Sequence, residues 1–414
     1  MNFGTDGIRG RYGSEDMNDG VARQLGAALF QHLGPVRLGV VRDPRSSGPA
    51  LTGALAEGFG GRLIDFGVQP TAALSVILRR GLADFGVAVT ASHNPAQDNG
   101  LKLLGRGGAK LTVSEERAIA ARTEATATSG TVERGDYDHV QALLEHLPGG
   151  RWLDGVHVAL DGAHGAGADC GPRVLEALGA TVTAIGVQPN GTNINADLGA
   201  VHPERLGDVV KEVGADVGLC LDGDADRCIL IDAHGTVVDG DALLLLLAHG
   251  PGVVGTVMCN AALPRALAAR GLGFERAGVG DRQVAQRMTA LGWSVGGEPS
   301  GHVLLTDGFP TGDGLLTGLR VLAGGVDLRS RLDGFALDPQ AKINLRVARK
   351  PPLDEVAALR EVEREVLSQG AERVLLRYSG TEPKLRILVE APDEALANTL
   401  ARRIADVAET YLGS

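Results

Sequence analysis

Three aspartates alternate with small residues in one short loop, Asp222-Gly-Asp224-Ala-Asp226-Arg227, between two apolar segments. Carboxylates spaced in this way can converge on one hard cation, which prefers oxygen ligands. A calcium EF-hand loop is excluded, because its sixth position requires Gly and is Arg227, and its twelfth requires Glu and is Ala233. A solvated acidic turn is the alternative, but three uncompensated carboxylates between buried strands would repel one another. The loop therefore predicts a metal site.

A serine lies in the turn after a predicted strand over residues 85–90, in the run Thr90-Ala-Ser92-His93-Asn94-Pro95. Such a turn can present the Ser92 hydroxyl to a ligand, although Ser, Asn and Pro are also common in ordinary turns. The Gly-x-Ser-x-Gly elbow of hydrolases is absent. His93 is not assigned as the base of Ser92, because catalytic triads are spatial rather than sequential. This loop alone leaves a functional turn and an ordinary turn open.

A third loop, Gly296-Gly-Glu298-Pro-Ser300-Gly-His302, offers polar groups that suit a sugar. The carboxylate of Glu298 and the hydroxyl of Ser300 could hydrogen-bond sugar hydroxyls, and His302 could move a proton. As an isolated signal, an ordinary turn is the more common interpretation.

A fourth loop contains Arg377, Ser379, Gly380 and Thr381 and follows a predicted strand, with Arg386 nearby. One Arg, two hydroxyls and a glycine backbone can form a phosphate cradle. Other phosphate signatures are missing: the chain has no Gly-x-x-x-x-Gly-Lys-Ser/Thr, and the glycines at 165, 167 and 171 miss the spacing of the dinucleotide fingerprint. These glycines are therefore poor support for NAD binding.

The segments between these loops predict an α/β architecture. Strands are predicted over residues 37–41, 85–90, 156–160, 217–221, 228–231 and 255–258, and helices over 20–33, 172–178 and 282–291. Short apolar strands that alternate with helices are typical of α/β folds with largely parallel sheets. Ligands of such sheets bind at the carboxyl ends of the strands, so the loops lie where a site is expected.

The length of 414 residues indicates two to four domains. Turn-rich breaks at 146–150 and 332–340 mark two boundaries, and a weaker boundary lies near 239–241. After the second break, predicted strands over 343–347, 374–377 and 385–390 and helices over 353–367 and 393–412 make an α+β domain of about 75 residues. The apolar face of the last helix is predicted to contain Leu396, Leu400, Ile404, Val407 and Tyr411.

The bulk composition limits the classes of partner. The net charge of −11 argues against a general nucleic-acid binder. No apolar run is long enough to span a bilayer, and the N-terminus shows no signal peptide. The four cysteines lack zinc-ligand spacing, which fits a reduced cytoplasm. We expect a cytoplasmic protein that binds neither nucleic acid nor membrane.

Taken together and in this order, the loops resemble those of the α-D-phosphohexomutase superfamily over essentially the whole chain. The opening segment 3–10, Phe-Gly-Thr-Asp-Gly-Ile-Arg-Gly, is also similar to that family. The stretches 191–195, 199–204, 279–282 and 311–314 are most similar to the branch that acts on glucosamine phosphates. The resemblance implies three mixed α/β domains of similar topology (1–149, 150–240 and 241–337) and a smaller C-terminal α+β domain (338–414) around a central active-site cleft.

The resemblance also implies an isomerase that interconverts glucosamine 6-phosphate and glucosamine 1-phosphate through a phosphoserine and a 1,6-bisphosphate. Ser92 would carry the phosphoryl group, Mg²⁺ would be bound by Ser92 and the three aspartates, and a sugar 1,6-bisphosphate would act as activator. The remaining implied site residues are Lys102, His302 and Arg9 for catalysis, and Arg227, Glu298, Ser300, Arg377, Ser379, Gly380 and Thr381 for substrate binding. The implied partner is a small phosphosugar, and the protein would be a monomer or a homodimer.

Two positions depart from the family pattern. Ala225 replaces a usual glycine, which we expect to matter little if its backbone φ is negative, and Pro299 replaces a polar residue or Met in the sugar loop. Three alternatives remain: a phosphomannomutase/phosphoglucomutase, a phosphatase that passes the phosphoryl group to water, and an inactive phosphosugar-binding protein. The phosphatase is disfavoured by the second phosphate loop, and the inactive protein by the presence of Ser92 and all three aspartates.

Overall fold

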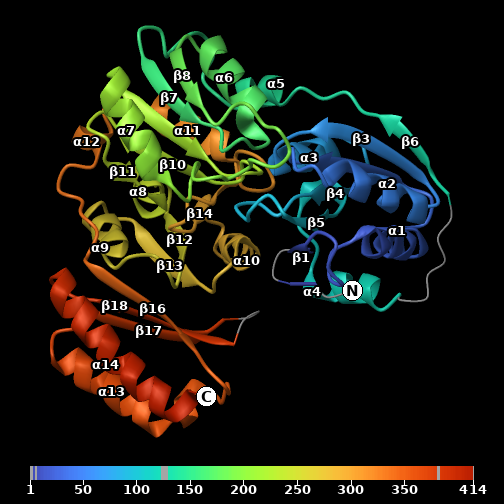
Figure 1. Cartoon of the computed structure of the whole chain (residues 1–414). Helices are drawn as coiled ribbons and strands as arrows, with labels where there is room; N and C mark the ends of the chain where they lie inside the picture. The colour runs from blue at the N-terminus through green and yellow to red at the C-terminus, as the bar shows by residue number, and fades with distance from the viewer. Residues whose placement is uncertain (1–2, 5–6, 123–128, 380–382, 414) are drawn as a thin grey trace. The chain divides into compact units, whose positions relative to one another are not determined.

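The computed structural model describes residues 3–4, 7–122, 129–379 and 383–413 (Figure 1). The chain forms two compact units. The first contains residues 1–258 and 272–333, and the second contains residues 259–271 and 334–414. The expected α/β architecture is confirmed, with three mixed sheets in the first unit and one antiparallel sheet in the second.

The first sheet has six strands in the order β1-β5-β4-β2-β3-β6. Its strands are β1 (Ile8–Arg11), β2 (Arg37–Arg42), β3 (Arg62–Val68), β4 (Phe85–Val89), β5 (Asp98–Leu104) and β6 (Thr131–Arg134). Its helices are α1 (Asp19–Leu33), α2 (Gly48–Gly58), α3 (Thr71–Arg79) and α4 (Val113–Ala120), with the 3-10 turn η1 (Arg106–Gly108). Strands β4, β2, β3 and β6 run parallel, whereas β5 is antiparallel to both of its neighbours.

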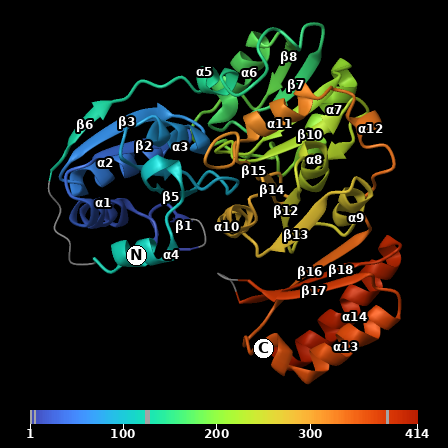
Figure 2. The same ribbon diagram turned by 180° about the vertical axis from the view of Figure 1, so that it is seen from behind.

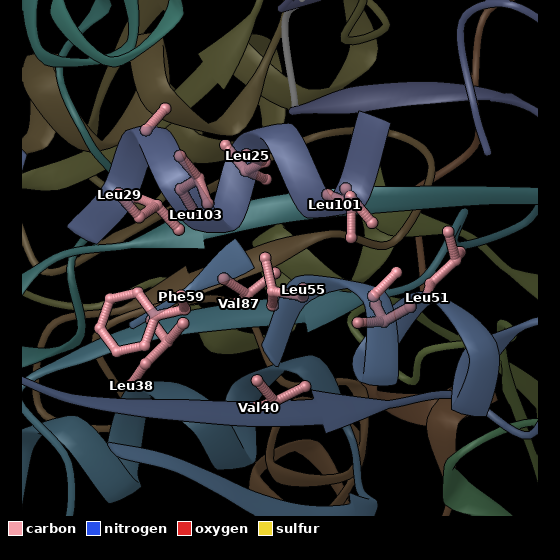
Figure 3. Packing of buried hydrophobic residues seen from close by; sticks show 14 of the residues in the cluster. Leu25, Leu29, Leu38, Val40, Leu51, Leu55, Phe59, Val87, Leu101 and Leu103 are labelled. Carbon is pink, nitrogen blue, oxygen red and sulfur yellow. The ribbon is translucent and has the colours of Figure 1, made fainter. Parts of the chain in front are cut away.

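Helices α1 and α2 pack on each other and on the first sheet. Figure 3 shows Leu25 of α1 and Leu55 of α2 directed at strand residues such as Val87 and Leu101, and all four are buried. The two helices approach closely because glycines face each other: a Cβ on Gly26 would lie 2.2 Å from the Leu55 carbonyl oxygen. A core of Leu, Val and Ala, as the low aromatic content requires, thus supports the strands that carry the loops.

The second and third sheets repeat this plan, with parallel strands that are followed toward one edge by antiparallel pairing. The second sheet, in the order β11-β10-β9-β7-β8, contains β7 (His157–Asp161), β8 (Thr181–Ile185), β9 (Val217–Leu221), β10 (Cys228–Asp232) and β11 (Val237–Val238). The third, in the order β13-β12-β14-β15, contains β12 (Gly252–Thr256), β13 (Gly273–Ala277), β14 (Val295–Gly297) and β15 (Val303–Leu305). The helices of this part are α5 (His139–Leu144), α6 (Gly167–Ala177), α7 (Pro203–Val213), α8 (Gly240–Leu247), α10 (Asp281–Leu291), α11 (Gly314–Ala323) and α12 (Leu328–Arg331).

The second unit is a three-stranded antiparallel sheet, β16-β18-β17, covered by helices. Its elements are β16 (Gln340–Arg346), η2 (Leu353–Glu355), α13 (Ala357–Ser368), β17 (Arg373–Tyr378), β18 (Lys384–Glu390) and α14 (Glu394–Leu412), together with α9 (Ala262–Ala269). Helices α13 and α14 lie side by side on one face of the sheet in both views (Figures 1 and 2).

Each of the four loops singled out in the sequence joins two antiparallel neighbours. The serine loop joins β4 to β5, the aspartate loop joins β9 to β10, and the third loop joins β14 to β15. The fourth loop joins β17 to β18. The three mixed sheets therefore present their chemical groups from the same topological position, where a parallel core strand meets its antiparallel partner.

Several element boundaries differ from the sequence-based expectations. Helix α6 begins at Gly167 rather than at residue 172, because its first turn is held by the aspartate loop: the Ala166 amide donates to the Gly223 carbonyl oxygen at 2.8 Å. Strand β12 begins at Gly252, three residues before the expected start. The expected helix over 353–367 is interrupted at Val356.

The buried face of α14 also differs, because Tyr411 is 48% exposed. The buried residues of α14 are Ala397, Leu400, Ala401, Ile404, Ala408 and Leu412. Three alanines, which were not among the residues predicted for the apolar face, therefore form part of the buried face of α14.

Candidate active site

Ser92 lies in the loop between β4 and β5 and is 1% exposed. Its φ of 54° places it in the left-handed region, which is strained for a residue with a Cβ. In this conformation the Ser92 hydroxyl donates a hydrogen bond to Asp222 Oδ2 at 2.7 Å. Two loops that are 130 residues apart in the sequence therefore meet at one serine oxygen, as a site for group transfer requires.

The three aspartates of the second loop converge. Ligand oxygens of Asp222, Asp224 and Asp226 all lie within 4.8 Å of one another, and all three residues are buried. Within the described part of the chain, Asp224 Oδ1 is buried without a hydrogen-bond donor. Buried carboxylates with an unpaired oxygen are the donor set that a hard cation such as Mg²⁺ prefers, so these residues fit a metal ion.

Lys102 supplies positive charge to this cluster. Its Nζ lies 2.7 Å from Asp224 Oδ2 and 3.2 Å from Asp226 Oδ2, and the lysine is 3% exposed. Thr71 also donates to Asp224 Oδ2, at 2.6 Å. One cationic side chain thus balances only part of the charge of three buried carboxylates.

The aspartates differ in their affinity for protons. Burial, together with Asp226 and Asp224, raises the pKa of Asp222 to about 8. Burial would also raise the pKa of Asp226, but Lys102 and other nearby cations outweigh it and hold this pKa well below its usual range. The pKa of Asp222 is raised by burial and because the three carboxylates repel one another, and a cation bound among their oxygens would relieve this repulsion.

His302 of the third loop faces the same cluster. Its Nδ1 lies 3.4 Å from Asp226 Oδ1 and its Nε2 lies 3.5 Å from Asp281 Oδ2. Burial alone would lower the pKa of His302, but these two carboxylates outweigh it and raise the pKa to about 9. His302 is therefore protonated at neutral pH and can stabilise negative charge or donate a proton.

Arg227 and Arg9 make the surroundings of the serine cationic. Arg227 Nε lies 3.9 Å from both Asp222 and Asp226, and Arg9 lies on β1 opposite Gly100 of β5. Burial, followed by the charges of Arg227 and Arg9, lowers the pKa of His93 to about 4. His93 Nδ1 lies 3.3 Å from Ser92 Oγ, so a neutral imidazole does touch the serine to which it is adjacent in sequence.

The third loop presents polar groups for a ligand. Within the described residues, the Ser300 hydroxyl is buried without a hydrogen-bond partner. Glu298 Oε1 accepts from the Gly280 amide at 3.0 Å, which fixes this carboxylate at the start of α10. Asp281, the first residue of α10, binds Lys110 at 2.6 Å, and Arg282 forms a two-pronged ion pair with Glu116 of α4. In the sequence, the stretch 279–282 stood out only for its family resemblance, and Lys110 and Glu116 carried no signal.

The expectation for Ala225 needs correction. Its φ is 56°, so the methyl group lies in the left-handed region where glycine is preferred, and the condition for treating the change as minor is not met. Ala225 is fully buried and its amide donates to the Asp222 carbonyl oxygen at 3.0 Å, within the turn of the aspartate loop. The metal loop therefore contains a strained alanine.

The fourth loop belongs to the second unit. Arg377 of β17 and Arg386 of β18 are directly opposite each other in the antiparallel register. Two guanidinium groups at opposite positions of a sheet can bind one anion. Ser379 is buried, and its carbonyl oxygen accepts from Lys350 Nζ at 2.7 Å. Gly380 and Thr381, expected in the same phosphate cradle, lie outside the described residues.

Comparison with known proteins places the chain in a family. Phosphoglucomutase/phosphomannomutase α/β/α domains I, II and III match residues 1–129, 138–235 and 239–328, and the C-terminal domain of the same family matches residues 343–407. The chain therefore belongs to the phosphoglucomutase/phosphomannomutase family, as its loops indicated.

Within this family, the chain is 40% identical to a phosphoglucosamine mutase from Methylibium petroleiphilum, over 98% of each chain. Other phosphoglucosamine mutases show 38–41% identity. A Burkholderia thailandensis phosphoglucomutase/phosphomannomutase family protein has a similar structure, with a TM-score of 0.80, 24% identity and coverage of 98% of this chain and 97% of that chain. An Aspergillus fumigatus N-acetylphosphoglucosamine mutase, solved with GlcNAc-6P and magnesium, has a TM-score of 0.68 and 18% identity, over 99% and 96% of the chains.

Among the described residues, no helix is both long and apolar enough to cross a membrane. The four cysteines are buried, and none of them forms a disulfide within the described part of the chain.

Proposed function

We propose that the chain is a phosphoglucosamine mutase, an isomerase that interconverts glucosamine 6-phosphate and glucosamine 1-phosphate. The observation that carries this proposal is the contact of Ser92 Oγ with Asp222 inside the cluster of three aspartates. A serine in this position can carry a phosphoryl group beside a metal site. The identity of about 40% to phosphoglucosamine mutases over 98% of both chains supports the choice of substrate.

In this proposal phosphorylated Ser92 transfers its phosphoryl group to O1 of glucosamine 6-phosphate. The Oγ–P bond breaks, an O1–P bond forms, and the proton of the O1 hydroxyl ends on Ser92 Oγ. The 1,6-bisphosphate turns around, and its 6-phosphoryl group returns to Ser92, which releases glucosamine 1-phosphate. The Ser92 hydroxyl donates to Asp222, so its proton can pass to this carboxylate when Oγ accepts the phosphoryl group.

Asp222, Asp224 and Asp226, with an oxygen of phosphorylated Ser92, would bind Mg²⁺, which when bound neutralises charge on the phosphoryl group. Lys102 and Arg227 add positive charge beside the same group, and their distances to the aspartates suit this role. Arg9 acts electrostatically, through the positive charge of its guanidinium group. His302, with a pKa raised to about 9, suits proton donation to O6 when the 6-phosphoryl group leaves.

Glu298 and the buried Ser300 hydroxyl would hold sugar hydroxyls. Arg377 and Ser379, together with Gly380 and Thr381, would bind the phosphate that is not being transferred; the opposed arginines at 377 and 386 support this role. A sugar 1,6-bisphosphate would restore enzyme that has lost its phosphoryl group. We also propose the four-domain division at residues 149, 240 and 337, and a cytoplasmic monomer or homodimer with no nucleic-acid partner.

The test combines mass measurement with a substrate comparison. Part of the purified protein should be heavier by one phosphoryl group on the Ser92 peptide, and Ser92→Ala should abolish turnover. Coupled assays should give a higher kcat/KM for glucosamine 6-phosphate than for glucose or mannose 6-phosphate. Preference for mannose 6-phosphate would move the protein to the phosphomannomutase class, and full activity of Ser92→Ala would refute the phosphoserine mechanism.

A further inference from the structure

Arg45 is a fully buried arginine that the proposed reaction does not use. It lies in the loop after β2, and its side chain and that of Asp43 are 0% exposed. Strands β2 and β4 are parallel neighbours in the first sheet. The loop after β2 leads to helix α2, whereas the serine loop after β4 leads to the antiparallel strand β5. Such a divergence of neighbouring connections is where open α/β sheets place their ligands.

Every N–H of the Arg45 guanidinium has an acceptor. Its Nε donates to Asp43 Oδ2 at 2.9 Å, and its Nη atoms donate to four backbone carbonyl oxygens of the serine loop. These carbonyls belong to Ser92 (3.0 Å), Asn94 (2.7 Å), Pro95 and Asp98 (2.8 Å). A guanidinium has five N–H donors in a fixed plane, and lysine has three at one nitrogen, so only arginine can make this set of contacts.

Asn195, which lies in the segment between β8 and α7, binds the same serine loop. Its Nδ2 donates to the carbonyl oxygens of Ser92 at 2.9 Å and Asn94 at 3.0 Å, which are two of the four acceptors of Arg45. Asn195 has a φ of 59°, which asparagine tolerates, and its own amide donates to the Ala163 carbonyl oxygen. Gly223 of the metal loop packs here, because a Cβ on it would lie 2.6 Å from the Ser92 carbonyl oxygen.

The amide of Ser92 is held from the same buried centre. It donates to Thr90 Oγ1 at 2.9 Å, and the Thr90 hydroxyl in turn donates to Asp43 Oδ2 at 2.6 Å. Both peptide groups of Ser92 are therefore tied to Asp43, the amide through Thr90 and the carbonyl through Arg45. A left-handed φ at a residue with a Cβ persists only where the surroundings determine it.

We propose that Arg45 and Asn195 are positioning residues: they clamp the carbonyls of Ser92 and Asn94 from two sides and thereby hold the Ser92 hydroxyl at the metal loop for phosphoryl transfer. This inference rests on the proposed function, because the clamp matters for rate only if Ser92 carries the phosphoryl group. Among the described residues, the side chain of Arg45 donates only to Asp43 and the serine loop, and that of Asn195 donates only to the serine loop. The clamp therefore acts on the transfer step rather than on sugar binding.

The test uses Arg45→Lys, which keeps the charge, and Asn195→Ala. The matched controls are Arg42→Lys and Asn193→Ala. Arg42 forms an ion pair with Asp65, and Asn193 lies in the same loop as Asn195. Each dephosphorylated protein is mixed with Mg²⁺ and glucose 1,6-bisphosphate, and Ser92 phosphorylation is followed by mass in a single turnover. The melting temperature and the KM for glucosamine 6-phosphate are measured in parallel.

We expect the rate constant of Ser92 phosphorylation to fall about 10²-fold in Arg45→Lys, the effect of a small misplacement of a reacting group. In Asn195→Ala it should fall about 10-fold, because one side of the clamp remains. KM should stay within about twofold of wild type, as the phosphoryl acceptor site is untouched. A purely structural role would instead reduce the amplitude of phosphorylation and the melting temperature, and leave the rate constant of the folded molecules unchanged.

A wild-type rate constant in folded Asn195→Ala or folded Arg45→Lys would overturn the inference. If Arg45→Lys does not fold, the rate constant of Asn195→Ala tests the inference. Asn195 is 9% exposed, so we expect its replacement to disturb the fold less than replacement of the fully buried Arg45. Failure of the wild-type protein to take up a phosphoryl group at Ser92 would instead refute the proposed function, so the two failures are distinguishable.

Discussion

Replacing Lys102 by Met should make the stability of the protein depend on Mg²⁺. Met keeps the length of the buried side chain and removes its charge, which lies 2.7 Å from Asp224 and 3.2 Å from Asp226. Breaking a buried ion pair by removing one partner costs about 3–5 kcal/mol. We expect the lower end, about 3 kcal/mol, because Asp222 already tends to hold a proton and further protonation relieves part of the repulsion.

At about 2 °C per kcal/mol for a unit of this size, the melting temperature without Mg²⁺ should fall by roughly 6 °C relative to wild type. Saturating Mg²⁺ should restore at least half of this loss, because the bound ion supplies the missing charge and stabilises the folded state by mass action. Turnover should remain low in both conditions, since Lys102 also serves the proposed transfer. Scanning calorimetry with chelator and with Mg²⁺ measures both melting temperatures.

The control is Lys110→Met, which removes an ion pair to Asp281 at 2.6 Å outside the aspartate loop. It should lower the melting temperature by the same amount with and without Mg²⁺. If Lys102→Met shows no larger response to Mg²⁺ than Lys110→Met, the three aspartates do not form the metal site that we infer.

Three further changes test other parts of the site. Asp224→Asn should reduce turnover by orders of magnitude, because a charged oxygen ligand is lost from the metal site; full activity of this variant, or of wild type in excess chelator, would contradict the role of the loop. Arg377→Ala should weaken binding of the 6-phosphate sugar by about 1.5–3 kcal/mol and release bisphosphate to solution, while Ser92 still accepts a phosphoryl group; wild-type turnover without released bisphosphate would refute the phosphate assignment. Ala225→Gly should change the free energy of unfolding by less than about 1 kcal/mol. Relief of about 1–2 kcal/mol of backbone strain is offset by the loss of a buried methyl group and by the larger entropy of the unfolded chain. Chemical denaturation measures this free energy, and a loss above about 2 kcal/mol would show that packing of the methyl group outweighs the strain.

Much of the site could be predicted from local sequence because its chemistry depends on residue type. Three alternating carboxylates such as Asp222, Asp224 and Asp226 have few uses other than a cation, and the order of the four loops indicated the family. Strands β2, β4 and β9 were expected within one residue of their observed bounds, because short apolar runs bounded by turns are strong signals. The start of α6 was missed, because its first turn depends on a contact with Gly223 rather than on local pattern.

The sequence by itself determined which groups are available: the serine, the aspartates and the histidine in loops after strands, and the arginines in or beside such segments. The tertiary structure decided which of them meet. Arg45 is one arginine among many until burial and four carbonyl acceptors make it part of the serine loop. Likewise, no residue type reveals that Ala225 has a positive φ or that Asn195 reaches the Ser92 carbonyl oxygen. Backbone dihedral angles and contacts between distant segments are set by packing, and packing depends on the whole chain rather than on any one stretch of it.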